Sequence, residues 1–190
     1  MPSQEKKAEP SLIEKTLIET ITASFKSKSN LNFSQDPDSS EKNVIEYNSR
    51  MRVFGLEKFD GPCFLSAVSF YASQKHLEDH DPCGVIVVFL DEEAVLKIMK
   101  GFGNMTRADD EETLMVGCGE FCKLIAGDFQ NAIGSLGYRN LVVSSPINYK
   151  NDAPEGIEFP YSEYKFHEAN FYLWKKKTMV VNVVLAPPPR

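Results

Sequence analysis

The sequence predicts an α+β domain in which helices pack on one largely antiparallel sheet. The longest segment of helical period spans residues 109–137, and its apolar residues form one stripe. The last two strand-like segments, 163–174 and 178–186, are separated by three lysines and predict a hairpin. Since no repeat or clear boundary interrupts the chain, we expect one domain over 11–186, a disordered tail over 1–10, and a short tail over 187–190.

The composition is that of an ordinary globular protein. The 190 residues are 42% hydrophobic and 25% charged, and the net charge is −6. No basic cluster exceeds Lys175–Lys177, which argues against a nucleic-acid partner, and no apolar run approaches the roughly 18 residues of a membrane span. Because the first residues contain no apolar signal segment, we expect a cytoplasmic protein whose four cysteines are thiols.

The first helix is expected to begin at Ser11, because Ser11 and Glu14 have capping-box spacing. Its buried face repeats every fourth residue, at Ile13, Leu17, Ile21 and Phe25. Residues 27–42 are rich in serine, asparagine and aspartate and predict a loop. Strands are expected at 44–54, 63–72 and 84–90, of which the last is continuously apolar and typical of a central buried strand.

The second half begins with a short helix over 92–102, for which Asp91 is the expected N-cap. The acidic run 109–112 suits the positive end of the long helix, so we interpret it as a helix start and not as a cation site. A strand is expected at 140–147, ended by Pro146.

Two residue pairs have spacings that could hold a metal. His76 and His80 lie four apart, but in a polar segment that we expect to be a solvated loop. Cys118 and Cys122 lie one helical turn apart, but both fall on the apolar stripe of the long helix, where cysteine behaves as a small hydrophobe. We therefore expect no metal site.

The long helix has two distinct faces. Its apolar stripe, which must face a core, consists of Leu114, Cys118, Phe121, Cys122, Ile125, Phe129, Ile133 and Leu136. The opposite line consists of Glu120, Lys123, Gly127, Gln130, Asn131 and Gly134. Each mid-helix glycine costs about 1 kcal/mol relative to alanine. This pattern indicates a face that leaves room for another molecule to approach.

Three segments, FLDEEAVLKIMKGFG, GEFCKLIAGDFQNAIGSLG and LVVSSPINY, resemble the CheC/CheX/FliY phosphatases of bacterial chemotaxis, and CheX in particular. The similarity covers 66–148, and its most specific part is Glu120, Lys123 and the step Ala126-Gly127. It implies a CheX/CheC-like fold and hydrolysis of the aspartyl phosphate of a CheY-like response regulator. In the family motif Glu-x-x-Asn, the glutamate contacts a regulator lysine and the asparagine aligns water. The regulator supplies Mg²⁺, so no cofactor of the chain's own is expected.

The sequence departs from this motif at position 123, which is lysine. A carboxamide oxygen can accept a hydrogen from water, whereas an ammonium group has three donors and no acceptor. We therefore expect a protein that docks on the receiver domain through Glu120, Lys123, Gly127, Gln130 and Asn131, with weak or lost phosphatase activity.

Three alternatives stay open. The chain could be an active phosphatase, or Asp128 and Asn131 could form a displaced motif two turns further along the helix. The resemblance could also be one of fold alone, with the helix facing a second copy of the chain.

The resemblance also implies a homodimer, joined in CheX by sheet edges. The hairpin over 163–186 is the expected edge, because unpaired strand edges are templates for another chain. Its aromatic residues, Phe166, Phe171, Tyr172 and Trp174, would add contact area. The alternative is that these aromatics pack on the first helix.

Overall fold

The computed structural model describes residues 10–44, 58–103, 110–151 and 165–188. Their strands form one sheet in the order β1-β6-β7-β3-β2-β4, with β5 also paired to β2, and every pairing is antiparallel. The strands are β1 (Asp38–Asn43), β2 (Cys63–Tyr71), β3 (Gly84–Asp91), β4 (Val142–Val143), β5 (Ile147–Lys150), β6 (Lys165–Leu173) and β7 (Lys176–Leu185).

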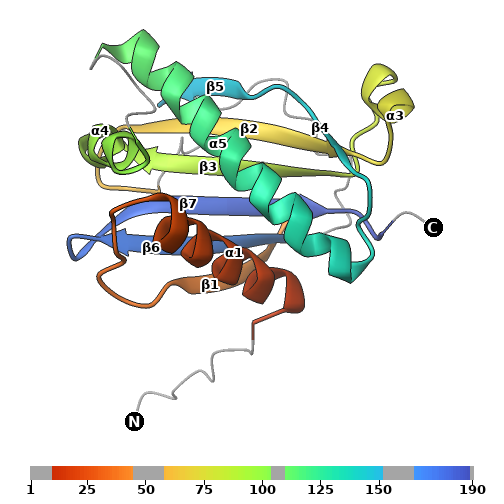
Figure 1. The fold of residues 1–190 in the computed structure, drawn as a ribbon, viewed down its shortest axis with the longest axis horizontal. Coiled ribbons are helices and arrows are strands. Elements are labelled where there is room, and N and C mark those ends of the chain that lie inside the picture. Colours follow the sequence, from red (N-terminus) through yellow and green to blue (C-terminus); the bar gives the residue numbers. More distant parts are fainter. Residues whose placement is uncertain (1–9, 45–57, 104–109, 152–164, 189–190) are drawn as a thin grey trace.

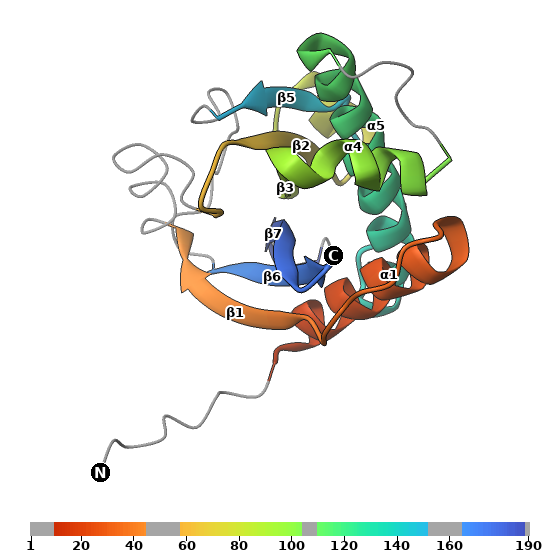
Figure 2. The ribbon, with the colours of Figure 1, turned by 90° about the vertical axis from the view of Figure 1, so that its left-hand side faces the viewer.

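The main helices cover one face of this sheet (Figures 1 and 2). Helix α5 (Glu111–Ile133) runs diagonally across the strands, with α1 (Leu12–Lys28) on one side of it and α4 (Glu92–Gly101) near its start. The short helices α3 (Gln74–Glu78) and η1 (Gly134–Leu136) complete the described elements. The predicted α+β class is confirmed.

Aromatic rings fill the layer between helices and sheet. Phe121 of α5 lies edge-on to Phe25 and Phe102, with ring centroids 6.2 and 5.1 Å apart. Phe171 of β6 joins the same cluster through Phe33, so this hairpin aromatic packs on the helix side of the sheet. Aromatic pairs in this geometry add about 0.5–1.5 kcal/mol beyond the area that they bury. The cluster fixes α5 on the sheet and leaves its opposite line outside.

The helix starts follow local capping chemistry. The capping box at Ser11 and Glu14 is present, as predicted. Helix α5 is capped by Asp110, whose carboxylate accepts a hydrogen bond from the backbone N–H of Thr113 at 2.9 Å. Asp91 stands at the start of α4 but makes no capping hydrogen bond; its carboxylate lies 2.8 Å from Nζ of Lys176 instead.

The hairpin of β6 and β7 is confirmed, but its place in the sheet differs from the prediction. Its two-residue turn holds Trp174 and Lys175 at φ 51° and 62°, the geometry that suits the twist of a hairpin. Strand β6 lies between β1 and β7, and β7 lies between β6 and β3. The expectation that this hairpin is a sheet edge is therefore wrong, because both strands already have two partners.

Strand β1 lies in a segment that was predicted to be a loop. It pairs with β6 from Asp38 opposite Asn170 to Asn43 opposite Lys165. Backbone pairing needs no apolar side chains at a sheet edge, and Asp38 accepts hydrogen bonds from Asn170 and Tyr172 at 2.7 and 2.6 Å. The polar composition of residues 38–42 therefore predicted a loop wrongly, because long-range pairing outweighs the local preference of these residues.

Other predicted boundaries also change. The strand expected over 140–147 is two short strands, β4 and β5, which both pair with β2. The segment around His76 contains α3, whose N-cap is Ser73. The predicted strand over 44–54 and the tail over 1–10 lie, apart from Val44 and Pro10, outside the described residues.

Candidate functional site

The exposed line of α5 is the candidate site. The apolar stripe predicted from the sequence is buried from Leu114 to Ile133, which turns the opposite side of the helix outward. Val116, Glu120, Lys123 and Asn131 are exposed, and Gly127 is half-buried between them. Within the described ranges, neither Glu120 nor Lys123 forms an ion pair. Both charged groups are therefore available to a partner.

Open space lies over the middle of this line. A Cβ atom built on Gly127 meets no atom within 4 Å, and the same holds for Gly134. Gly119, by contrast, faces the sheet, where a Cβ would lie 2.7 Å from the side-chain amide of Asn148. The helix thus uses one glycine for close packing and leaves another on its open face.

An apolar groove extends the line toward the start of α5. It holds about 560 Å³ and is lined by Glu111, Glu112, Met115, Val116, Pro146, Ile147 and Asn148. Val116 is 59% and Ile147 44% exposed, which places two of the four exposed large apolar residues of the described chain in this groove. Since Val116 precedes Glu120 by one helical turn, the groove and the exposed line form one surface.

The groove was not predicted from the sequence. Its two walls come from segments about 30 residues apart, and they meet because β5 pairs with β2 beneath α5. Ile147 was assigned to a predicted strand, and nothing local distinguishes it from a core residue. The one sign of the groove in the sequence was an apolar residue, Val116, on the polar side of the helix.

Gln130 of the predicted line and Asp128, which lies beside that line, have structural contacts. The Gln130 amide donates to the carbonyl of Leu141, which holds the segment before β4 against the helix. The Asp128 carboxylate lies 2.6 Å from Nζ of Lys28 and accepts a hydrogen bond from Ser24 at 2.6 Å, so it joins α5 to α1. These contacts favour a structural role for Asp128 over a displaced motif with Asn131.

The two cysteines on the apolar stripe are buried, as their position in the sequence predicted. Cys118 and Cys122 are buried free thiols, and Cys122 donates to the carbonyl of Ser66 at 3.3 Å. Burial raises the pKa of Cys118 to about 12 and also raises the pKa of Cys122. A thiol with so high a pKa is a poor metal ligand and nucleophile at neutral pH.

No protein-family model matches the sequence, and no curated protein matches it. The structure, however, is similar to CheX from Vibrio vulnificus, with a TM-score of 0.57 and 11% identity over 91% of this chain and 98% of that one. A CheC-like superfamily protein from Shewanella sp. PV-4 gives 0.56 and 14%, over 92% and 97%.

The chain has the CheC/CheX/FliY fold. The resemblance seen in the sequence is thus confirmed for the fold. A third similar structure is the CheX–CheY–BeF3–Mg²⁺ complex from Borrelia burgdorferi, with a TM-score of 0.53 and 15% identity over 90% of this chain and 96% of that one. Among the described residues, no helix of this CheX-like chain is long and apolar enough to cross a bilayer.

Proposed function

We propose that this CheX-like chain docks on a CheY-like receiver domain through the exposed line of α5. The observation that carries the proposal is the continuous surface formed by Val116, Glu120, Lys123 and the open space over Gly127. A structure of the same fold has been determined in complex with CheY, which supports a partner of this kind. The exposed charges and the half-buried glycine together suit close approach by another protein.

Lys123 is expected to make the docked complex weakly active or inactive. In phosphoryl transfer, most of the catalysis comes from positioning and electrostatics, so loss of the group that orients water removes a large part of it. The ammonium of Lys123 can neutralise phosphate charge but cannot accept a hydrogen from the attacking water. The receiver would supply both the phosphoaspartate and Mg²⁺, and the chain would need no cofactor of its own.

The test combines binding with release of inorganic phosphate. Wild type, Glu120→Ala and Lys123→Asn are mixed with a phosphorylated CheY-like receiver and Mg²⁺. We expect wild type to bind but to release phosphate no faster than the receiver alone. Lys123→Asn should accelerate release about tenfold or more, because it restores the carboxamide. Glu120→Ala in the Lys123→Asn background should abolish that gain.

Matched variants on α1 serve as controls. Glu19→Ala and Lys26→Asn make the same chemical changes at exposed positions of another helix and should alter neither binding nor phosphate release. Accelerated hydrolysis by wild type would favour the alternative, an active phosphatase. If wild type does not bind the receiver, the proposal is wrong, and the similarity to CheX is one of fold alone.

The groove gives a second, independent test. Val116→Asp places a charge at an exposed position, where folding should be little affected. If the receiver covers the groove, the buried charge should weaken binding about tenfold or more. Leu12→Asp, at a 64% exposed apolar residue of α1, is the matched control and should leave binding unchanged. Equal binding by wild type and Val116→Asp would remove the groove from the docking surface.

We also propose that the chain forms a homodimer, now through an edge other than the hairpin. Among the described strands, β1 and the β4–β5 side end the sheet. Strand β1 carries Glu41 and Lys42, and charged side chains on an edge discourage pairing with another chain. The β4–β5 side is the better edge, because β4 carries no charged residue and β5 carries only Lys150. Sedimentation of wild type and Val142→Lys, a change in β4 outside the groove, would test this, with a monomeric wild type contradicting it.

A further inference from the structure

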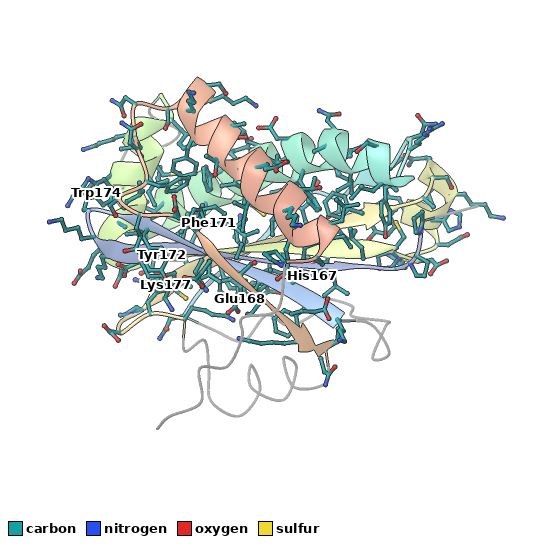
Figure 3. The ribbon with its side chains drawn as sticks, turned by 90° about the horizontal axis from the view of Figure 1, so that it is seen from below. His167, Glu168, Phe171, Tyr172, Trp174 and Lys177 are labelled. Carbon is teal, nitrogen blue, oxygen red and sulfur yellow. The ribbon has the colours of Figure 1, made fainter. Side chains whose placement is uncertain are left out.

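Three side chains from three separate elements converge on the helix side of the sheet, away from α5. They are Glu14 at the start of α1, Glu41 on β1 and His167 on β6, and their ligand atoms all lie within 4.8 Å of one another. Glu14 is 4% and His167 7% exposed. Figure 3 shows His167 below one end of α1. The topology builds this cluster, since the three residues lie far apart in the sequence.

The distances favour a shared ligand at the centre. Nδ1 of His167 is 3.9 Å from a carboxylate oxygen of Glu14 and 3.7 Å from one of Glu41. These separations are too long for hydrogen bonds. Two ligands of a tetrahedral Zn²⁺ lie about 3.3 Å apart when each bond is about 2.0–2.1 Å. The carboxylates of Glu14 and Glu41 lie within 4.8 Å of each other, so shifts of up to about 1.5 Å would bring all three atoms into coordination.

The charges also leave a place for a cation. Lys165 pairs with the Oε1 atom of Glu41 at 2.6 Å, and this leaves Oε2 directed toward His167. Glu14 accepts a hydrogen bond from the backbone N–H of Ser11, but among the described residues it has no lysine or arginine partner. A buried carboxylate without a cation is costly, and a bound ion would remove that cost.

The imidazole is suited to act as a ligand. Burial lowers the pKa of His167 and so favours the neutral ring, although Glu14 and Glu41 oppose the shift. Its Nδ1 atom lies 3.3 Å from the hydroxyl of Ser11, a group able to donate to an unprotonated ring nitrogen. With the proton on Nε2, the lone pair of Nδ1 faces the same space as the two carboxylates.

We infer that Glu14, Glu41 and His167 form a binding site for a divalent transition-metal ion of the Zn²⁺ type. One imidazole and two carboxylates are a donor set that Zn²⁺ accepts, whereas Mg²⁺ and Ca²⁺ prefer oxygen ligands alone. Three protein ligands leave one position for water or for the hydroxyl of Ser11. The bound ion would join the start of α1 to the edge strand β1 through β6.

Zn²⁺ titration of the purified full-length chain by calorimetry tests the site. We expect one Zn²⁺ per chain, no competition by Mg²⁺, and a higher unfolding temperature in its presence. Glu41→Gln and His167→Gln should each weaken binding about tenfold or more, because each removes a ligand. Glu41 is partly exposed on an edge strand, so its variant keeps the test valid if His167→Gln fails to fold.

Two controls separate this site from other metal-binding groups. The double variant His76→Gln/His80→Gln, which leaves the cluster intact, and Glu19→Gln should both bind Zn²⁺ as wild type does. Co²⁺ should give a weak visible spectrum without thiolate charge-transfer bands. Unchanged affinity in Glu41→Gln and His167→Gln, or a thiolate spectrum, would overturn the inference. The result is independent of receiver binding, because α5 contributes no ligand.

Discussion

Two glycines of α5, Gly119 and Gly127, have opposite roles although they are the same residue type. Gly119 lies under Asn148 of β5, and the Asn148 amide accepts a hydrogen bond from the hydroxyl of Ser66 at 2.8 Å. Ser66 is only 1% exposed, so this hydrogen bond cannot be replaced by solvent without rearrangement. Gly127 has no such neighbour, and there the absence of a side chain leaves room for a partner.

Alanine at each glycine should therefore change stability in opposite directions. Gly119→Ala forces the Asn148 amide to move and should lower the free energy of unfolding by about 1–2 kcal/mol. Gly127→Ala fills open space and removes the entropy cost of glycine in a helix, so it should raise that free energy by about 0.5–1 kcal/mol. Urea unfolding followed by circular dichroism measures both. Equal effects in the two variants would contradict this account of Gly119.

The buried cysteines, Cys63, Cys118 and Cys122, should be unreactive in the folded protein. Burial raises the pKa of Cys63 to about 11, with the charge of Asp91 acting in the same direction, and that of Cys118 to about 12. At pH 8 both are thiols without thiolate character, so iodoacetamide should label them only after denaturation. Cys83 is half-buried and should react first. Mass spectrometry of the labelled chain, with and without urea, would show the order; rapid labelling of Cys118 in the folded state would be inconsistent with it.

At the scale of elements, a polar contact holds α1 against α5. Asp128 lies next to Lys28, and Ser24 donates to the same carboxylate from within the helix interface. Ser24 is 3% exposed, whereas Lys28 is 43% exposed at its side chain. The buried hydrogen bond therefore contributes more than the exposed ion pair.

Asp128→Ala should lower the free energy of unfolding by about 1 kcal/mol, because Ser24 loses an acceptor but keeps the carbonyl of Thr20. It should not change receiver binding or phosphate release. The measurements are urea unfolding and the phosphate assay, with Asp79→Ala, in the surface turn after α3, as the control. Loss of receiver binding at full stability would instead support the displaced motif of Asp128 and Asn131.

At the scale of the whole molecule, the sheet has a second buried face opposite the helices. Its apolar cluster includes Leu65, Val87, Phe89 and Val180. Glu168 of β6 points to this face, away from its neighbour His167, and pairs there with Lys42 and Lys58 (Figure 3). A buried carboxylate between two lysines makes the stability of the whole domain depend on pH.

Burial acts to raise the pKa of Glu168, but Lys58 and Lys42 outweigh it and hold that pKa below the usual value for glutamate. A carboxyl group with a lower pKa in the folded state stabilises the fold above its unfolded pKa, roughly 4.3, and this stabilisation is lost as the pH falls through the folded pKa. Wild type should therefore lose stability below about pH 4.3.

Glu168→Gln tests this assignment. The variant should be less stable at pH 7 by about 3 kcal/mol, because it removes the carboxylate beside buried Lys58. Its free energy of unfolding should also fall less steeply in acid than that of wild type. Urea unfolding between pH 3 and 7 measures both effects, and Glu78→Gln on α3 is the control. Parallel pH profiles of wild type and Glu168→Gln would show that another carboxyl group is responsible.

The sequence predicted the long helix, its buried stripe and the hairpin of β6 and β7. Each has a strong local signal, either helical periodicity or two strand-like segments with a short connection. The exposed Glu120 and Lys123 followed from the same periodicity. Strand β1 could not be predicted from periodicity. Its polar residues resemble a loop, and only pairing with β6 makes them a strand.

By itself, the sequence thus determined which face of α5 is buried and that its exposed line carries Glu120 and Lys123. Only the tertiary structure decided where the hairpin lies in the sheet, which wall completes the groove beside Val116, and which side chains surround His167. The physical reason is distance along the chain. Periodicity reports what lies within a few turns, whereas strand order and register, set by packing over the whole molecule, bring remote residues together.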